Sequence, residues 1–305
     1  MFTHPCYIYL YLITHFFSGT KILIAGGEYN NTSYILEVYF NDTTITNIDY
    51  KDLPNVPHSF DGATFGPFMG RSVIISGENS NGQCFEFDQE EYQVIPSLNV
   101  NREDAASTFI QNKIVVAGGY DDSGNNLDSI EILDWDESNH GSQWIRSLSS
   151  LPKIHYSSHT MVTFNKKLFM IGGSYRLKIL DTIWEGTLDK PSNEISWVEM
   201  GLRLQKKRYD HFSFVISNQI ITFGGENVDD DFLEIIENNR LIQGPKVPFK
   251  LDTYNDQAVL DRKNRIIITS NKHGLIVYDH QAGTFTPYNN FKLREERRGY
   301  AAILQ

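Results

Sequence analysis

The sequence of 305 residues lacks the short motifs that mark most metal sites, phosphate sites and activated nucleophiles. The patterns HExxH, CxxC, GxSxG and GxGxxG and the phosphate-loop pattern are all missing. Only two cysteines occur, Cys6 and Cys84, too few for a disulfide framework or a cysteine-rich zinc site. We therefore expect no catalytic residue, no metal and no cofactor, and we predict that the chain is not an enzyme.

Positive charge is also scarce. Lys and Arg number 27 against 38 Asp and Glu, which gives a formal net charge of −11 and an isoelectric point near 5.3. An acidic chain repels phosphate backbones, so we expect no nucleic acid partner. No apolar run beyond residue 20 could cross a bilayer, and we predict no membrane span.

The N-terminus allows two interpretations. Tyr7–Phe17 is an apolar run, but it has only about half of the roughly twenty residues that a span needs. It is either a secretion signal, followed by the small residues Ser18 and Gly19, or an ordinary apolar segment or imperfect chain start. The first interpretation predicts a secreted protein glycosylated at Asn30, Asn31 or Asn41. The second predicts a cytoplasmic one. We divide the chain into this segment, residues 1–20, and a domain at 21–305.

An apolar run that stops at glycine recurs along the domain every 42 to 54 residues. The six copies are KILIAGG ending at Gly27, RSVIISG at Gly77, KIVVAGG at Gly119, KLFMIGG at Gly173, QIITFGG at Gly225 and RIIITS at Ser270. Each copy contains four short runs typical of β-strands, separated by turn residues, and no segment shows a sustained helical period. A repeat of this length indicates a repeat architecture.

Four strands repeated six times predict an all-β fold, a six-bladed β-propeller. The glycine-terminated run is expected to be the second strand of each blade, buried on both faces. Its glycines would permit positive φ and close backbone approach. The chain ends in RRGYAAILQ, a first strand without a second, so we expect this C-terminal strand to pair with Lys21–Ala25 and close the ring. The alternative is that Tyr7–Phe17 supplies the missing strand.

These residues resemble the kelch-repeat family. The resemblance rests on the glycine doublets, on Trp144 and Trp197 about 25 residues after their doublets, and on Arg102, Arg208 and Arg298 before first strands. It covers roughly residues 21–305. It implies a kelch-type propeller such as that of BTB–kelch adaptors, here without a BTB segment before residue 21. Such domains bind cytoskeletal proteins or select substrates for ubiquitin ligases.

The loops predict where a partner binds. The strand 2–3 loops and the blade-to-blade loops emerge on one face, and the former are acidic while the latter are basic. We therefore predict a positive centre inside a negative rim, suited to a protein or peptide partner with an acidic segment. The candidate binding residues are Arg102, Lys153, His155, Tyr156, Arg208, Tyr209, Arg298 and Tyr300, with Tyr254 as a further aromatic in the same loops.

Two other functions stay open at this point. Four histidines, His58, His155, His159 and His211, fall near first strands and could line a metal site, but we expect structural roles for them. The main alternative is a secreted propeller that binds or modifies glycans. We favour a non-catalytic interaction module.

Overall fold

The structure is a computed structural model. It describes residues 19–26, 32–42, 44–57, 60–68, 71–78, 80–88, 90–135, 143–152, 156–176, 178–226, 228–251, 256–291, 293–294 and 301–305. This described part contains strands and no helix. It therefore also holds no helix that is long and apolar enough to cross a membrane.

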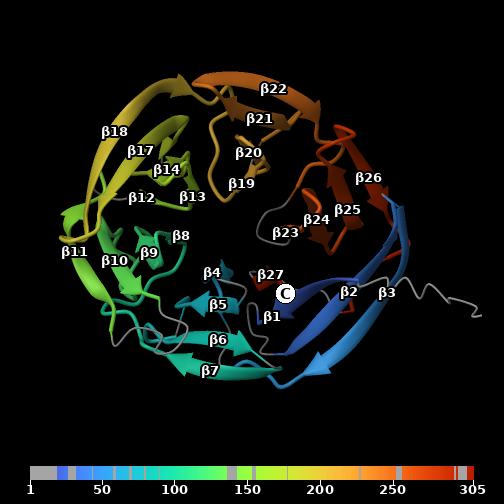
Figure 1. Ribbon diagram of the computed structural model, residues 1–305, viewed down its shortest axis with the longest axis horizontal. Coiled ribbons are helices and arrows are strands. Elements are labelled where there is room, and N and C mark those ends of the chain that lie inside the picture. Colours follow the sequence, from blue (N-terminus) through green and yellow to red (C-terminus); the bar gives the residue numbers. More distant parts are fainter. Residues whose placement is uncertain are drawn as a thin grey trace, which may run out of the picture.

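Six four-stranded antiparallel sheets are arranged around a central axis (Figure 1). The first contains β27 (Ala301–Leu304), β1 (Thr20–Ala25), β2 (Ser33–Asn41) and β3 (Thr44–Leu53). The second contains β4 (Thr64–Phe68), β5 (Arg71–Ile75), β6 (Cys84–Asp88) and β7 (Glu91–Ile95). The third contains β8 (Ala106–Ile110), β9 (Lys113–Ala117), β10 (Ser129–Asp134) and β11 (Ile145–Ser150).

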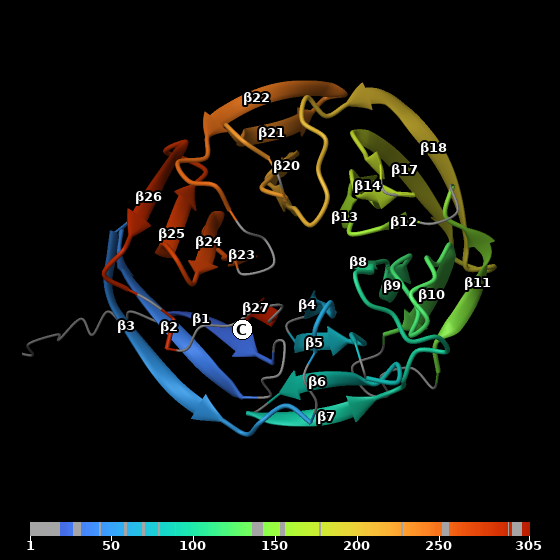
Figure 2. The same ribbon diagram turned by 180° about the vertical axis from the view of Figure 1, so that it is seen from behind.

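The remaining sheets continue the same order around the axis, as the view from behind also shows (Figure 2). The fourth contains β13 (Thr160–Phe164), β14 (Lys167–Ile171), β17 (Thr182–Asp189) and β18 (Glu194–Arg203). The fifth contains β19 (Phe212–Ile216), β20 (Gln219–Phe223), β21 (Phe232–Glu237) and β22 (Arg240–Lys246). The sixth contains β23 (Asp256–Leu260), β24 (Arg265–Ser270), β25 (Gly274–Asp279) and β26 (Thr284–Tyr288). A small sheet joins β12 (Tyr156–Ser157), β15 (Ser174–Tyr175) and β16 (Lys178–Ile179).

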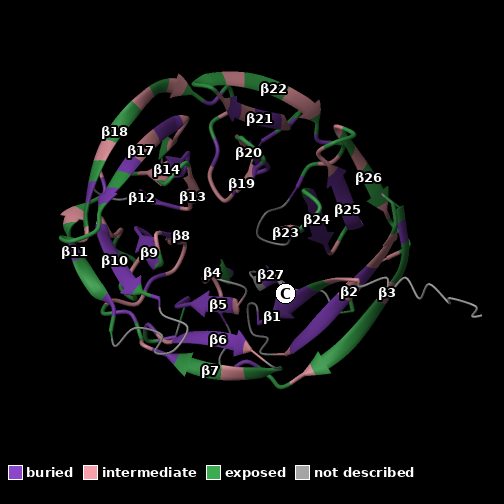
Figure 3. Ribbon diagram, in the orientation of Figure 1, coloured by how far each residue is buried: buried purple, intermediate pink, exposed green. Residues whose placement is uncertain are grey.

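Burial follows the strand order within each sheet (Figure 3). The second strands are the apolar glycine-terminated runs, and β9 and β24 are buried along their whole length. The fourth strands lie outermost and alternate or are largely exposed, as in β7 and β18. The predicted position of the apolar run inside the sheet is therefore confirmed.

The hydrophobic core lies between neighbouring sheets. One apolar cluster joins the third and fourth sheets through residues such as Val115 and Met170. Other clusters join the remaining consecutive pairs, and one of them packs Ile24 of the first sheet against Ile267 of the sixth. Burial of apolar area between sheets is thus spread around the whole axis, and no sheet depends on a single neighbour.

The glycine doublets bring one sheet against the next. Gly118 and Gly119 have φ of +70° and +85°, and the amide of Gly119 donates to the carbonyl of Tyr156 at 2.9 Å. A Cβ on Gly118 would lie 2.6 Å from that same carbonyl oxygen. The prediction of positive φ and close approach is confirmed, because a side chain here would separate two sheets.

The C-terminal strand β27 lies on the free edge of β1. Residues Ala301–Leu304 pair antiparallel with Ile22–Ala25, and the amide of Gln305 donates to the carbonyl of Lys21 at 2.9 Å. Ile303 is 1% exposed. The competing segment, Tyr7–Phe17, lies outside the described residues.

Candidate binding site at the channel mouth

Four equivalent residues just before first strands form a hydrogen-bonded arc around the axis, here called the channel mouth. They are Gly62, Asp104, Ser158 and Asp210, and all have φ between +48° and +62°. The amide of Asp104 donates to the carbonyl of Gly62 at 2.8 Å. The same bond occurs twice more along the arc. The amide of Ser158 donates to the carbonyl of Asp104, and the amide of Asp210 donates to the carbonyl of Ser158, each at 2.9 Å. Backbone bonds between sheets thus fix the loops that surround the axis.

A cavity of about 270 Å³ opens at the channel mouth. The innermost strands β4, β8, β13, β19 and β23 supply its walls (Figure 1). Hydroxyl groups bond across these walls from strand to strand, Thr64 to Ser107 at 2.7 Å and Thr160 to Ser213 at 2.6 Å. The cavity is therefore polar where neighbouring first strands meet.

Carboxylates dominate the charge at the channel mouth. Burial, and then the carboxylate of Asp104, raise the pKa of Glu103 to about 7. Burial, and then the carboxylate of Asp210, raise the pKa of Asp104 to about 7, and burial raises that of Asp210 to about 6. Further carboxylates that raise one or more of these values belong to Asp61, Glu78, Asp122 and Glu226.

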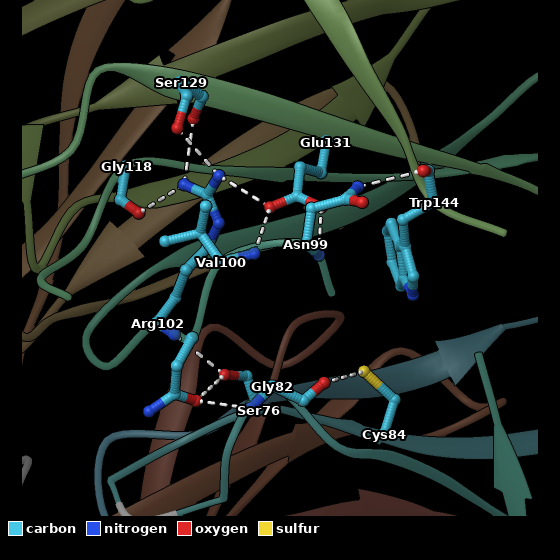
Figure 4. Close-up of polar contacts among 11 residues, drawn as sticks. Ser76, Gly82, Cys84, Asn99, Val100, Arg102, Gly118, Ser129, Glu131 and Trp144 are labelled. Carbon is cyan, nitrogen blue, oxygen red and sulfur yellow. Dashed lines mark hydrogen bonds and ion pairs between the residues drawn. The ribbon is translucent and has the colours of Figure 1, made fainter. Parts of the chain in front are cut away.

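Arg102, which we predicted to contact a partner, is buried instead. Its side chain is 1% exposed and forms an ion pair with Glu131 at 3.0 Å (Figure 4). The guanidinium also donates to the carbonyls of Gly118 and Ser129, both at 3.0 Å. Glu131 in turn accepts the amide of Asn99 at 2.7 Å, so the pair ties the incoming loop to β9 and β10.

Arg208 forms an equivalent buried Arg–Glu pair in the fifth sheet. We call such a pair, with its bonds to the loop before the first strand, a clasp. Arg208 is fully buried and lies 2.7 Å from Asp231 and 3.1 Å from Glu234. Its guanidinium donates to the carbonyl of Gly224 at 2.7 Å, as Arg102 does to that of Gly118. The predicted contact role of both arginines is wrong, because their charge and donors are used inside the protein.

Burial of these two arginines removes part of the basis for the predicted positive centre. With Arg102 and Arg208 neutralised in the interior, the charged groups left at the channel mouth in the described part of the chain are carboxylates. Within that part, Glu103, Asp104 and Asp210 form no ion pair with a basic side chain. The described residues that border the channel mouth are therefore acidic where they are charged.

The predicted aromatic contacts divide into two cases. Tyr156 is fully buried, and its hydroxyl lies 2.9 Å from that of Thr182, so it is not a contact residue. Tyr209 is half-buried and its hydroxyl donates to Glu226 beside the channel mouth, where it stays a candidate. Lys153, His155, Arg298, Tyr300 and Tyr254 lie outside the described residues.

Sequence reasoning missed Asp104 and Asp210. A signal for them exists, because both occur in the pattern Arg-x-Asp that begins at Arg102 and Arg208. The pattern puts the arginine four residues before the first strand and the aspartate two residues before it. The arginine is buried and pairs with Glu131 or Glu234, and the aspartate borders the cavity at the channel mouth.

His159 and His211 also line the cavity, as their predicted position near first strands implies. Each is 5% exposed, and burial lowers the pKa of His159 to about 4 and that of His211 well below its usual value. Nε2 of His211 lies 3.0 Å from the hydroxyl of Thr160. Among the described residues no group of three or more His, Cys, Asp or Glu side chains is placed to hold a metal ion.

The comparison with known families agrees with the geometry of the third sheet. Residues 101–136 match the kelch motif, a span that includes Arg102, the doublet Gly118–Gly119 and Glu131. No curated protein matches the chain. The match supports a kelch-repeat protein with an interaction function, and it leaves the type of adaptor and the partner open.

Proposed function

We propose that the chain is a six-bladed kelch-type propeller, closed by β27, that binds a protein partner at the channel mouth and catalyses no reaction. The kelch motif at residues 101–136 and the six four-stranded sheets support this architecture. One observation carries the binding role: backbone bonds and buried Arg–Glu clasps hold the loops of one end in place around an open polar cavity. Loops preorganised in this way lose little entropy on binding.

The proposal places the protein in the cytoplasm as an adaptor, with substrate recognition for a ubiquitin ligase as the role that the kelch resemblance suggests. The secreted glycan-binding alternative predicts a shortened N-terminus near residue 20 and glycosylation at Asn30, Asn31 or Asn41. Mass spectrometry of the protein from cells and from medium distinguishes these locations.

The binding role is tested by photo-crosslinking in cells. Ser123 lies in the exposed strand 2–3 loop at the proposed face, and Lys190 lies in the exposed strand 3–4 turn at the opposite end. A photoreactive residue at position 123 is expected to give discrete protein adducts, and the matched variant at position 190 is not. Identical adducts from both positions, or none from position 123, would contradict the proposal.

A further inference from the structure

The cavity at the channel mouth combines two acidic side chains with an unused polar group. Asp104 and Asp210 border it, and the described part of the chain offers neither of them an ion pair. Burial is the main cause that raises the pKa of both carboxyls; the charges that add to it belong to Asp210, Asp61 and Glu226 for Asp104 and to Glu226 for Asp210, and all of them are acidic. A positive group placed here would relieve both effects at once.

His159 gives an independent indication of a polar occupant. It lines the same cavity, is 5% exposed, and neither ring nitrogen has a hydrogen-bond partner among the described residues. Buried side-chain nitrogens in folded proteins nearly always have one. A donor or acceptor on an occupant of the cavity would supply it.

The size of the cavity limits the occupant. About 270 Å³ lies below the range of roughly 300 to 1,000 Å³ that is typical of small-molecule and cofactor sites. This volume is enough for one long side chain. A metal ion is disfavoured, since no cluster of three ligating side chains is placed for it in the described part.

We propose that the channel mouth receives the side chain of a lysine or arginine from a protein partner, held between Asp104 and Asp210. The hydroxyl-lined walls of β8, β13 and β19 surround its aliphatic stem, and its nitrogens donate charge-assisted hydrogen bonds to the two carboxylates. This inference rests on the proposed binding function and reverses the acidic partner that the sequence predicted.

The experiment selects displayed random short peptides on the immobilised full-length protein. The wild type is expected to enrich peptides with a lysine or arginine at one fixed position. The variant Asp104→Asn/Asp210→Asn is expected to bind the selected peptide about 10- to 100-fold more weakly, the usual effect of losing charge-assisted bonds. A matched variant, Asp49→Asn/Glu91→Gln, removes the same charge from exposed outer strands and should bind normally.

A second measurement avoids any change to the protein. The selected peptide is resynthesised with citrulline or norleucine in place of its basic residue, and the wild type should then bind it about 10- to 100-fold more weakly. Enrichment of acidic or neutral peptides, or equal binding of the citrulline or norleucine peptide, overturns this inference and leaves the binding function standing. Failure to enrich any peptide, together with no adducts from position 123, overturns both.

Discussion

Replacing Gly119 with alanine should destabilise the protein much more than the same change at Gly124. Both glycines have positive φ, +85° and +73°. An L-residue in this region costs about 1 to 2 kcal/mol, and the reduced entropy of the unfolded chain returns about 0.4 to 1 kcal/mol. Backbone conformation alone therefore predicts a similar loss of about 1 kcal/mol for both variants.

The surroundings of the two glycines separate these variants. A Cβ at Gly119 would lie 2.3 Å from the carbonyl oxygen of Glu103, whereas Gly124 has nothing within 4 Å. Glu103 cannot move away easily, because its amide and carbonyl both bond to the backbone of Tyr120, at 3.0 and 2.9 Å. Forcing an atom into such a contact costs about 1 to 3 kcal/mol more. The expected total for Gly119→Ala is about 2 to 4 kcal/mol.

Thermal and urea unfolding followed by tryptophan fluorescence measure the difference. The two variants differ by the close-contact cost of about 1 to 3 kcal/mol, so at about 2 to 4 °C per kcal/mol Gly119→Ala should unfold roughly 2 to 12 °C below Gly124→Ala. Gly283→Ala, another glycine of positive φ with nothing within 4 Å, should behave like Gly124→Ala. Equal midpoints for the three variants would refute the reasoning that close approach between loops, rather than φ alone, requires glycine at position 119.

Three further results are expected. Arg102→Met and Glu131→Gln should each cost about 3 to 5 kcal/mol, the effect of leaving one member of a buried pair, and the double variant should cost less than their sum. As a control, Lys246→Met breaks the exposed pair with Asp230 and should cost under about 1 kcal/mol. Strictly additive losses at Arg102 and Glu131 would contradict a clasp. Asp104→Asn should stabilise the protein at pH 8 and change its stability little at pH 4. The pKa of Asp104 is raised to about 7 in the folded state, above the unfolded value of about 3.9, so the wild type loses stability as pH rises through 7. Asparagine does not ionise and avoids this loss. Melting curves of both proteins across this range check it, and an equal shift at both pH values would count against it. Ile303→Ala should cost about 2 to 4 kcal/mol because that side chain is 1% exposed; an unchanged denaturation midpoint would argue against a stabilising β27–β1 pairing.

The features that could be predicted from the sequence are those that repeat. The apolar run before Gly119 and its equivalents indicate buried second strands, and doublets such as Gly118–Gly119 indicate positive φ, because each pattern has a local physical cause. The kelch resemblance rests on the same repetition, and the motif is found at residues 101–136. The edge partner of β1 could also be proposed, because an unmatched strand at each end of the chain leaves few alternatives.

The binding residues could not be predicted in the same way, because the sequence does not show which charges find partners inside the fold. Arg102 is expected at the surface because it stands in a loop, and its partner Glu131 lies 29 residues later on β10, between the buried apolar residues Ile130 and Ile132. Tyr156 stands in a loop-like stretch too, yet pairs in the small sheet and is fully buried. Long-range pairing of this kind decides exposure, and it is absent from local patterns.

The clasp also explains why the channel mouth is acidic. In the pattern Arg-x-Asp, the arginine leaves the surface to pair with Glu131 or Glu234, and the aspartate two residues later remains beside the axis. Each repeat that gains the clasp therefore removes one positive charge from the face and leaves one negative charge on it. Repeats arranged around a common axis bring these leftover carboxylates together, which raises their pKa values by mutual repulsion and burial. The clasp that holds the loops in place thus also determines the charge at the surface that a partner contacts. A cationic side chain is the group that this charge attracts.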